Sequence, residues 1–107
     1  MSRIGIVLYR PRKGKDEEVV NMIRDHFPFL RRLGFLTERK VMAMRTKDGS
    51  IMVVFEWISA ESIGKAEAHE GVQEIWMQAS KISDFDKPGT VKELNEVFPD
   101  FEPIDIE

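Results

Sequence analysis

Two strand-like segments of this chain are apolar at both alternating positions, and this pattern limits the possible folds more than any other feature. The first runs from Arg3 to Arg10 and the second, the most apolar segment of the chain, from Ile51 to Ile58. A strand with one face in water alternates apolar and polar residues, whereas a strand covered on both faces does not. Both segments are therefore predicted to lie inside a sheet that has cover on each side.

A helix is predicted between these two strands. Three acidic residues starting at Asp16 would lie in its first turn, where the helix dipole favours negative charge. Pro28 lies inside the helical pattern and is expected to kink or break the helix near Arg24 to Phe27, and Gly34 is expected to end it. The apolar stripe of this helix consists of Val19, Val20, Ile23, Phe27 and Leu30.

A hairpin is predicted after this helix. Phe35 to Arg45 has the composition of a long strand, and its polar residues from Thr37 to Lys40 suggest an exposed or bulged first half. The Asp48-Gly49 pair is typical of a hairpin turn. The chain would then return through Ile51 to Ile58 as the third strand.

Helices dominate the second half of the chain. Ser59 is a good N-cap for a helix that runs to about His69, and Gly71 separates it from a second helix that carries Trp76. Thr90 and Glu93 have the spacing of a capping box for a further short helix. The last strand is predicted from Phe101 to Ile106.

The order of elements predicts a single α+β domain over residues 1–107: a ferredoxin-like βαββαβ unit with an antiparallel sheet and extra helices near the C-terminus. Its helices would cover only one face of the sheet. A second copy packed sheet to sheet is the simplest cover for the other face, so a homodimer is expected.

Composition excludes several classes of function. The chain has no cysteine, and its two histidines are far apart in the sequence, so neither a metal site nor a bound cofactor is expected. A net charge of -3 argues against nucleic-acid binding. No apolar run is long enough to cross a membrane, and the first residues lack the apolar core of a signal peptide, so a cytoplasmic location is expected.

The segment from Glu56 to Ser62, a strand ending in Glu-Trp followed by a Ser-capped helix, resembles the central motif of the antibiotic-biosynthesis-monooxygenase-like family. The basic loop from Arg12 to Lys15, the Leu-Gly-Phe at 33–35, and Ala68-His69 with Trp76 after it also match the order of elements in that family.

This resemblance implies a dimeric α/β barrel with a pocket between the sheet and the helices of each subunit. Members include cofactor-independent monooxygenases of aromatic polyketides and quinols, and heme-degrading enzymes. The heme-degrading branch uses an Asn on the first strand, which this chain lacks, and has a Trp and a His on later helices, where this chain aligns Ala66 and Trp76. That branch is therefore not expected.

The two histidines are the candidate catalytic bases, because imidazole accepts a proton near neutral pH. His69 is the first choice and His26, beside the expected helix break, is the second. Each has a structural alternative: His69 at a helix end would face solvent or cap carbonyl groups, and His26 would satisfy backbone groups freed by Pro28.

The candidate substrate contacts are Tyr9, Trp57, Trp76 and Glu56. The aromatic residues offer stacking surfaces with a polar handle, although packing in the core would equally account for them. Glu56 is costly to bury, so it is expected to be exposed at the strand end, to be part of a polar site, or to pair with an arginine, for which Arg10 and Arg45 are the candidates.

Two functions remain open from the sequence. One is oxidation of an aromatic or quinol compound without a cofactor, with the protein removing a proton from the substrate. The other is a non-catalytic module of the same fold that binds a small molecule or serves for dimerisation.

Overall fold

A computed structural model describes residues 1–106, so of the predicted domain only Glu107 lies outside the described residues. The elements are β1 (Arg3–Pro11), α1 (Asp16–Arg32), β2 (Met42–Arg45), β3 (Ile51–Trp57), α2 (Ala60–Ala68), α3 (Glu70–Ile82), β4 (Ser83–Asp86), the 3₁₀ turns η1 (Pro88–Thr90) and η2 (Lys92–Asn95), and β5 (Glu102–Ile104). Among the described residues, no helix is long and apolar enough to cross a membrane.

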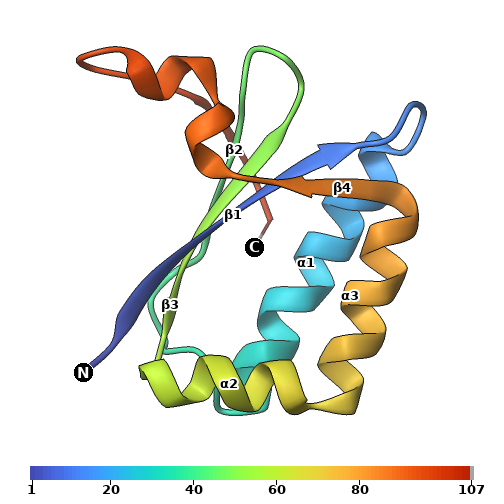
Figure 1. Cartoon of the computed structure of the whole chain (residues 1–107), viewed down its shortest axis with the longest axis vertical. Helices are drawn as coiled ribbons and strands as arrows, with labels where there is room; N and C mark the ends of the chain where they lie inside the picture. The colour runs from blue at the N-terminus through green and yellow to red at the C-terminus, as the bar shows by residue number, and fades with distance from the viewer. Residues whose placement is uncertain (107) are drawn as a thin grey trace.

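The five strands form one antiparallel sheet in the order β4-β1-β3-β2-β5. The helices α1, α2 and α3 lie on the same side of this sheet, while the segment after β4, coloured orange to red, lies away from them (Figure 1). The first four strands have the ferredoxin-like order, so the predicted fold class is confirmed.

The central pair β1 and β3 is apolar on both faces, as the sequence predicts. Val7 pairs with Val53 on the helix side, and Leu8 pairs with Met52 on the opposite side, which we call the open face. The main core on the helix side includes Ile23, Phe27 and Leu30 of α1.

The chain itself covers part of the open face. Val91, between the two 3₁₀ turns, packs with Phe101 against Leu8 and Met52. The remaining apolar side chains of this face stay accessible to solvent. They include Ile4, Ile6 and Met42, which are 58%, 50% and 61% exposed.

Arg10 fixes this C-terminal segment to the sheet. Its guanidinium donates to the carboxylates of Asp86 in β4, at 2.9 Å, and Asp48 in the hairpin turn, at 2.8 Å. It also donates to the hydroxyl of Thr90 in η1 at 2.8 Å. One side chain at the end of β1 therefore joins the hairpin, β4 and η1.

Of the kink or break predicted at Pro28, the break is wrong, because α1 continues through Pro28 to Arg32. A proline removes one backbone hydrogen bond from a helix. The buried side chains on both sides of it, Phe27 and Leu30, remain packed in the main core. Tertiary packing thus outweighs the local preference.

The prediction of one long second strand from Phe35 is also wrong in its first half, because β2 begins only at Met42. In the part of the chain that the structure describes, a single isolated bridge, from Leu36 to Trp57, precedes β2. The polar segment between them turns instead, since the Thr37 hydroxyl donates to Glu56 at 2.7 Å and accepts from the backbone N–H of Arg39.

The fourth strand of the fold is β4, which the sequence did not indicate. Three of its four residues are polar and three are exposed, so it carries little apolar signal. The predicted last strand does form, as β5, but it pairs with β2 at the other edge of the sheet.

The predicted capping box at Thr90 is wrong, because that region forms two 3₁₀ turns in which Thr90 donates to the carbonyl of Lys87. The Glu93 carboxylate accepts instead from the backbone N–H of Lys47, at 2.8 Å. Glu93 therefore anchors the hairpin turn and not a helix start.

Two local predictions are confirmed. Gly49 adopts a φ of +88° in the hairpin turn, a conformation that favours glycine. Ser59 caps α2 by accepting from the backbone N–H of Ser62, while the Ser62 hydroxyl accepts from the N–H of Ser59.

Candidate functional site

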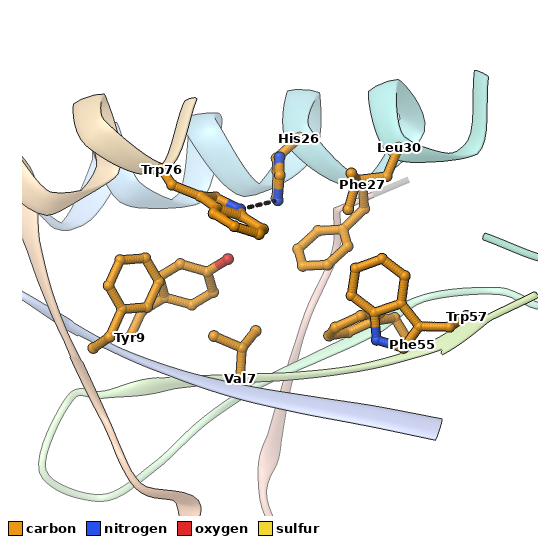
Figure 2. A pocket seen from close by; sticks show the side chains of 9 residues that line it. Val7, Tyr9, His26, Phe27, Leu30, Phe55, Trp57 and Trp76 are labelled. Carbon is orange, nitrogen blue, oxygen red and sulfur yellow. Dashed lines mark hydrogen bonds between the residues drawn. The ribbon is translucent and has the colours of Figure 1, made fainter. Parts of the chain in front are cut away.

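A cavity of about 420 Å³ lies between the sheet and the helices α1 and α3. Its walls come from β1, β3, β4, α1 and α3, and Figure 2 shows their side chains directed toward one shared space. The lining residues are Val7, Tyr9, His26, Phe27, Leu30, Phe55, Trp57, Trp76 and Phe85.

Aromatic rings in mutual contact form one end of the cavity. The rings of Phe27 and Phe55 lie 5.0 Å apart, and those of Phe55 and Trp57 lie 5.3 Å apart in an edge-to-face arrangement. Such pairs contribute more than their buried area alone. The glycine at position 5 gives these rings room, because a Cβ there would lie 2.8 Å from Phe55 and 2.9 Å from the Trp57 indole nitrogen.

His26 and Trp76 form the opposite wall, where α1 faces α3 (Figure 2). The indole N–H of Trp76 donates to Nε2 of His26 at 3.3 Å. His26 is only 3% exposed, and its Nδ1 has no hydrogen-bond partner among the described residues. A neutral imidazole that accepts at Nε2 carries its proton on Nδ1, which assigns the tautomer.

Burial lowers the pKa of His26 to about 4. The side chain is therefore uncharged at neutral pH, because a buried imidazolium would lose its hydration. Its one lone pair on nitrogen already accepts from Trp76. Both facts make His26 a weak base as the cavity stands.

Tyr9 lies on the sheet side of the cavity and is 3% exposed. Burial raises the pKa of its phenol, so the hydroxyl keeps its proton across the physiological range. Its ring packs against Phe85 of β4 at 5.1 Å. Phe85 is 46% exposed, so the cavity meets solvent beside it.

The sequence-predicted site residues separate into two groups. Tyr9, Trp57, Trp76 and His26 come together at the cavity, although they are distant in the sequence. His69 is not among the lining residues: its Nδ1 accepts from the backbone N–H groups of Gly71 and Val72, at 3.0 and 3.3 Å. It serves as the N-cap of α3, so its role is structural, although it caps backbone N–H groups and not the carbonyls considered from the sequence.

Glu56 also lies outside the cavity. It pairs with Ile4 in the sheet register and so belongs to the open face. Its carboxylate accepts from the hydroxyls of Thr37 and Ser2 and from the guanidinium of Arg39, at 2.7, 3.0 and 3.1 Å. These bonds, led by the one from Thr37, lower the pKa of Glu56.

The predicted arginine partners of Glu56 are wrong. Arg10 binds Asp48 and Asp86, and Arg45 binds Asp16 at 2.6 Å. Both arginines lie near the hairpin end of the sheet, whereas Glu56 is at the other end of β3. Arg39 reaches it because the polar segment before β2 folds back over that end.

Five lining residues were not singled out from the sequence: Val7, Phe27, Leu30, Phe55 and Phe85. Four of them fit the apolar pattern of predicted strands or helices, so the sequence indicates only that they are core residues. Phe85 belongs to the strand that was missed.

Within residues 1–106, no three histidine, aspartate or glutamate side chains lie close enough together to hold a metal ion.

Comparison with known proteins supports the fold. No family model matches this chain, and no curated protein matches it. Among solved structures, a NIPSNAP family protein from Agrobacterium tumefaciens strain C58 is similar, with a TM-score of 0.57, 20% identity, and coverage of 80% of this chain and 88% of that one. The likeness shows a shared ferredoxin-like fold, and membership in the monooxygenase-like family remains a prediction.

The close approach at position 5 gives the first prediction. Gly5→Ala should lower the free energy of unfolding by about 1–3 kcal/mol, because the new methyl group overpacks two buried rings. Gly64→Ala in α2 is the matched control: a Cβ there meets nothing within 4 Å, so it should be neutral or stabilising. Urea denaturation measures both variants, and equal effects would contradict the packing argument.

The second prediction concerns pH. The pKa of His26 falls from 6.5 to about 4 on folding, so between these values the unfolded chain binds more protons than the folded one. The free energy of unfolding should therefore decrease as the pH falls from 6.5 to 4. The full decrease due to His26, reached below both pKa values, is roughly 3 kcal/mol.

The variant His26→Gln isolates this contribution, because glutamine keeps an acceptor for Trp76 but does not titrate. Denaturation curves at several pH values should show a shallower pH dependence for the variant than for the wild type. Parallel curves would mean that His26 is not buried in its neutral form.

Proposed function

We propose that this chain binds a compact, largely aromatic small molecule in the cavity between the sheet, α1 and α3. The carrying observation is the cavity itself, with a volume of about 420 Å³ and walls formed almost entirely by apolar and aromatic side chains. Ligand sites in proteins typically measure ~300–1,000 Å³ and have such walls.

Packing energetics support this proposal. Protein interiors are close-packed, and a large apolar space forfeits the dispersion contacts of every side chain around it. Rings such as Phe55, Trp57 and Trp76 offer edges and faces that match another flat molecule. A ligand of that shape would replace the missing contacts.

A cavity-filling variant tests this proposal, with naphthalene as the probe. In the wild type, naphthalene should shift the methyl NMR signals of Val7 and Leu30, which line the cavity. Val7→Phe should weaken binding at least about tenfold, since overpacking costs ~1–3 kcal/mol. Ile6→Phe is the control on the same strand, because its side chain is 50% exposed and lies outside the cavity. Equal loss in both variants would place the binding elsewhere.

A second candidate function is oxidation of an aromatic or quinol compound without a cofactor. One observation favours it: an uncharged histidine, His26, lines the apolar cavity. Such a reaction needs a base to deprotonate the substrate before it meets oxygen. With its pKa near 4 and its Nε2 already hydrogen-bonded, His26 offers weak assistance, so binding is the better-supported function.

Oxygen uptake separates these two candidates. With 1,4-dihydroxynaphthalene, a binding protein should leave the rate within about twofold of buffer at pH 7. An increase of about tenfold or more that is lost in His26→Gln would overturn this expectation and establish His26 as the base. His69→Gln serves as the comparison, because His69 caps α3 outside the cavity.

We also propose that two copies of the chain pair through the open face. The uncovered side chains Ile4, Ile6 and Met42 present an apolar area on the open face of strands β1 and β2. Burying it against a second copy would remove this surface from water, as in other sheet-on-sheet packings.

Light scattering tests the pairing. The wild type should have twice the chain mass of 12.4 kDa at micromolar concentration. Ile6→Asp should give the chain mass, because an unpaired charge in such an interface is costly. Met77→Asp, on the exposed side of α3, should leave the dimer intact. A folded wild-type monomer would contradict the proposal.

A further inference from the structure

The hydroxyl group of Tyr9 stands out among the polar atoms of the cavity. Figure 2 shows it directed into the space between the Trp76 and Phe27 rings. Among residues 1–106, none forms a hydrogen bond with this hydroxyl, although Tyr9 is 3% exposed. The hydroxyl is not among the fully buried atoms that lack a partner, so it is accessible from the cavity and free to bond a ligand there.

The other polar atoms of the walls are engaged or turned away. The Trp76 N–H donates to Nε2 of His26. In Figure 2 the Trp57 indole nitrogen faces the sheet, near the position of Gly5, and Nδ1 of His26 lies beside the α1 backbone. Nδ1 of His26 also lacks a partner among the described residues, but it is fully buried, so the Tyr9 hydroxyl is the polar group that a ligand in the cavity can reach.

The lack of charged side chains in the cavity lining also limits which ligands can bind. None of the lining residues is an aspartate, glutamate, lysine or arginine. A charged ligand would leave water without meeting a counter-ion, which strongly disfavours its binding. The site therefore favours an uncharged ligand.

We infer that the cavity selects uncharged aromatic carbonyl compounds, with the Tyr9 hydroxyl donating a hydrogen bond to the carbonyl oxygen. This inference rests on the proposed binding function and adds the residue that determines specificity. A phenol is a better donor than acceptor, because its oxygen lone pair is delocalised into the ring. A carbonyl oxygen accepts such a bond and carries no charge, so it suits both the hydroxyl and the apolar walls.

Three ligands of similar shape test this selectivity. They are 2-acetylnaphthalene, which has a carbonyl acceptor, 2-ethylnaphthalene, which has none, and 2-naphthoate, which is an anion at pH 7. In the wild type, the ketone should bind roughly 2- to 12-fold more tightly than the hydrocarbon, the gain typical of one net hydrogen bond. Naphthoate should bind more weakly than both. The methyl NMR signals of Val7 and Leu30 report occupancy for all three.

Tyr9→Phe removes only the hydroxyl and keeps the ring. In this variant the ketone should bind no more tightly than the hydrocarbon, because its carbonyl oxygen would lose water and gain no partner, and the hydrocarbon should bind at least as tightly as in the wild type. Trp76→Phe is the control, because it alters the wall but leaves the Tyr9 hydroxyl in place. The ketone should keep its advantage over the hydrocarbon there, whatever the absolute affinities become.

The outcomes separate this inference from the function on which it rests. If the two neutral ligands bind the wild type equally, or if Tyr9→Phe keeps the preference for the ketone, Tyr9 does not determine specificity although the cavity binds ligands. Binding of naphthoate as tight as that of the ketone would overturn selection for an uncharged ligand. If none of the three shifts the Val7 or Leu30 signals, the binding function fails and this inference fails with it.

Discussion

The antiparallel pairing of β1 with β3 is the constraint on which the rest of this structure depends. Seven residue pairs, from Arg3 opposite Trp57 to Tyr9 opposite Ile51, fix the register at the centre of the sheet. A slip by one residue would exchange the two faces of a strand. This register therefore determines that Val7 and Tyr9 line the cavity while Ile4 and Ile6 lie on the open face.

The walls of the cavity depend on the same pairing. Gly5 lies opposite Phe55, and its missing side chain leaves room for the Phe55 and Trp57 rings. Across the cavity, the bond between Trp76 and His26 joins α3 to α1. The rings of Phe55 and Trp57 on β3 thus lie on one side of the cavity, and the His26–Trp76 pair lies on the other, so the cavity remains between them.

Predictions from the sequence held where a local signal agreed with tertiary packing. Apolar residues at both alternating positions identified β1 and β3, the Asp48-Gly49 pair identified the hairpin, and Ser59 identified the start of α2. They did not hold where distant residues decide the conformation. Pro28 stays helical because its neighbours are buried, and the segment before β2 folds back because Glu56 binds Thr37 and Arg39.

In the candidate site, too, some residues could be predicted from the sequence and others required the structure. Tyr9, Trp57, Trp76 and His26 could be selected from residue chemistry, because each combines an aromatic ring with a polar atom. The purely apolar walls, such as Val7 and Leu30, have no chemistry that separates them from the core. His69 was the leading candidate because histidine chemistry is visible in a sequence, whereas its capping bonds to Gly71 and Val72 require the geometry of the α2–α3 junction.

The two proposed surfaces use opposite faces of one strand, and this arrangement keeps them separate. The cavity lies on the helix side of the sheet, and the proposed pairing surface lies on the open face. The C-terminal segment, held by Arg10, already covers Leu8 and Met52 on the open face. Pairing would therefore involve the end of the sheet around Ile4 and Ile6. Coupling between ligand and partner would have to pass through the β1 backbone, where Ile6 and Val7 are adjacent but face opposite ways.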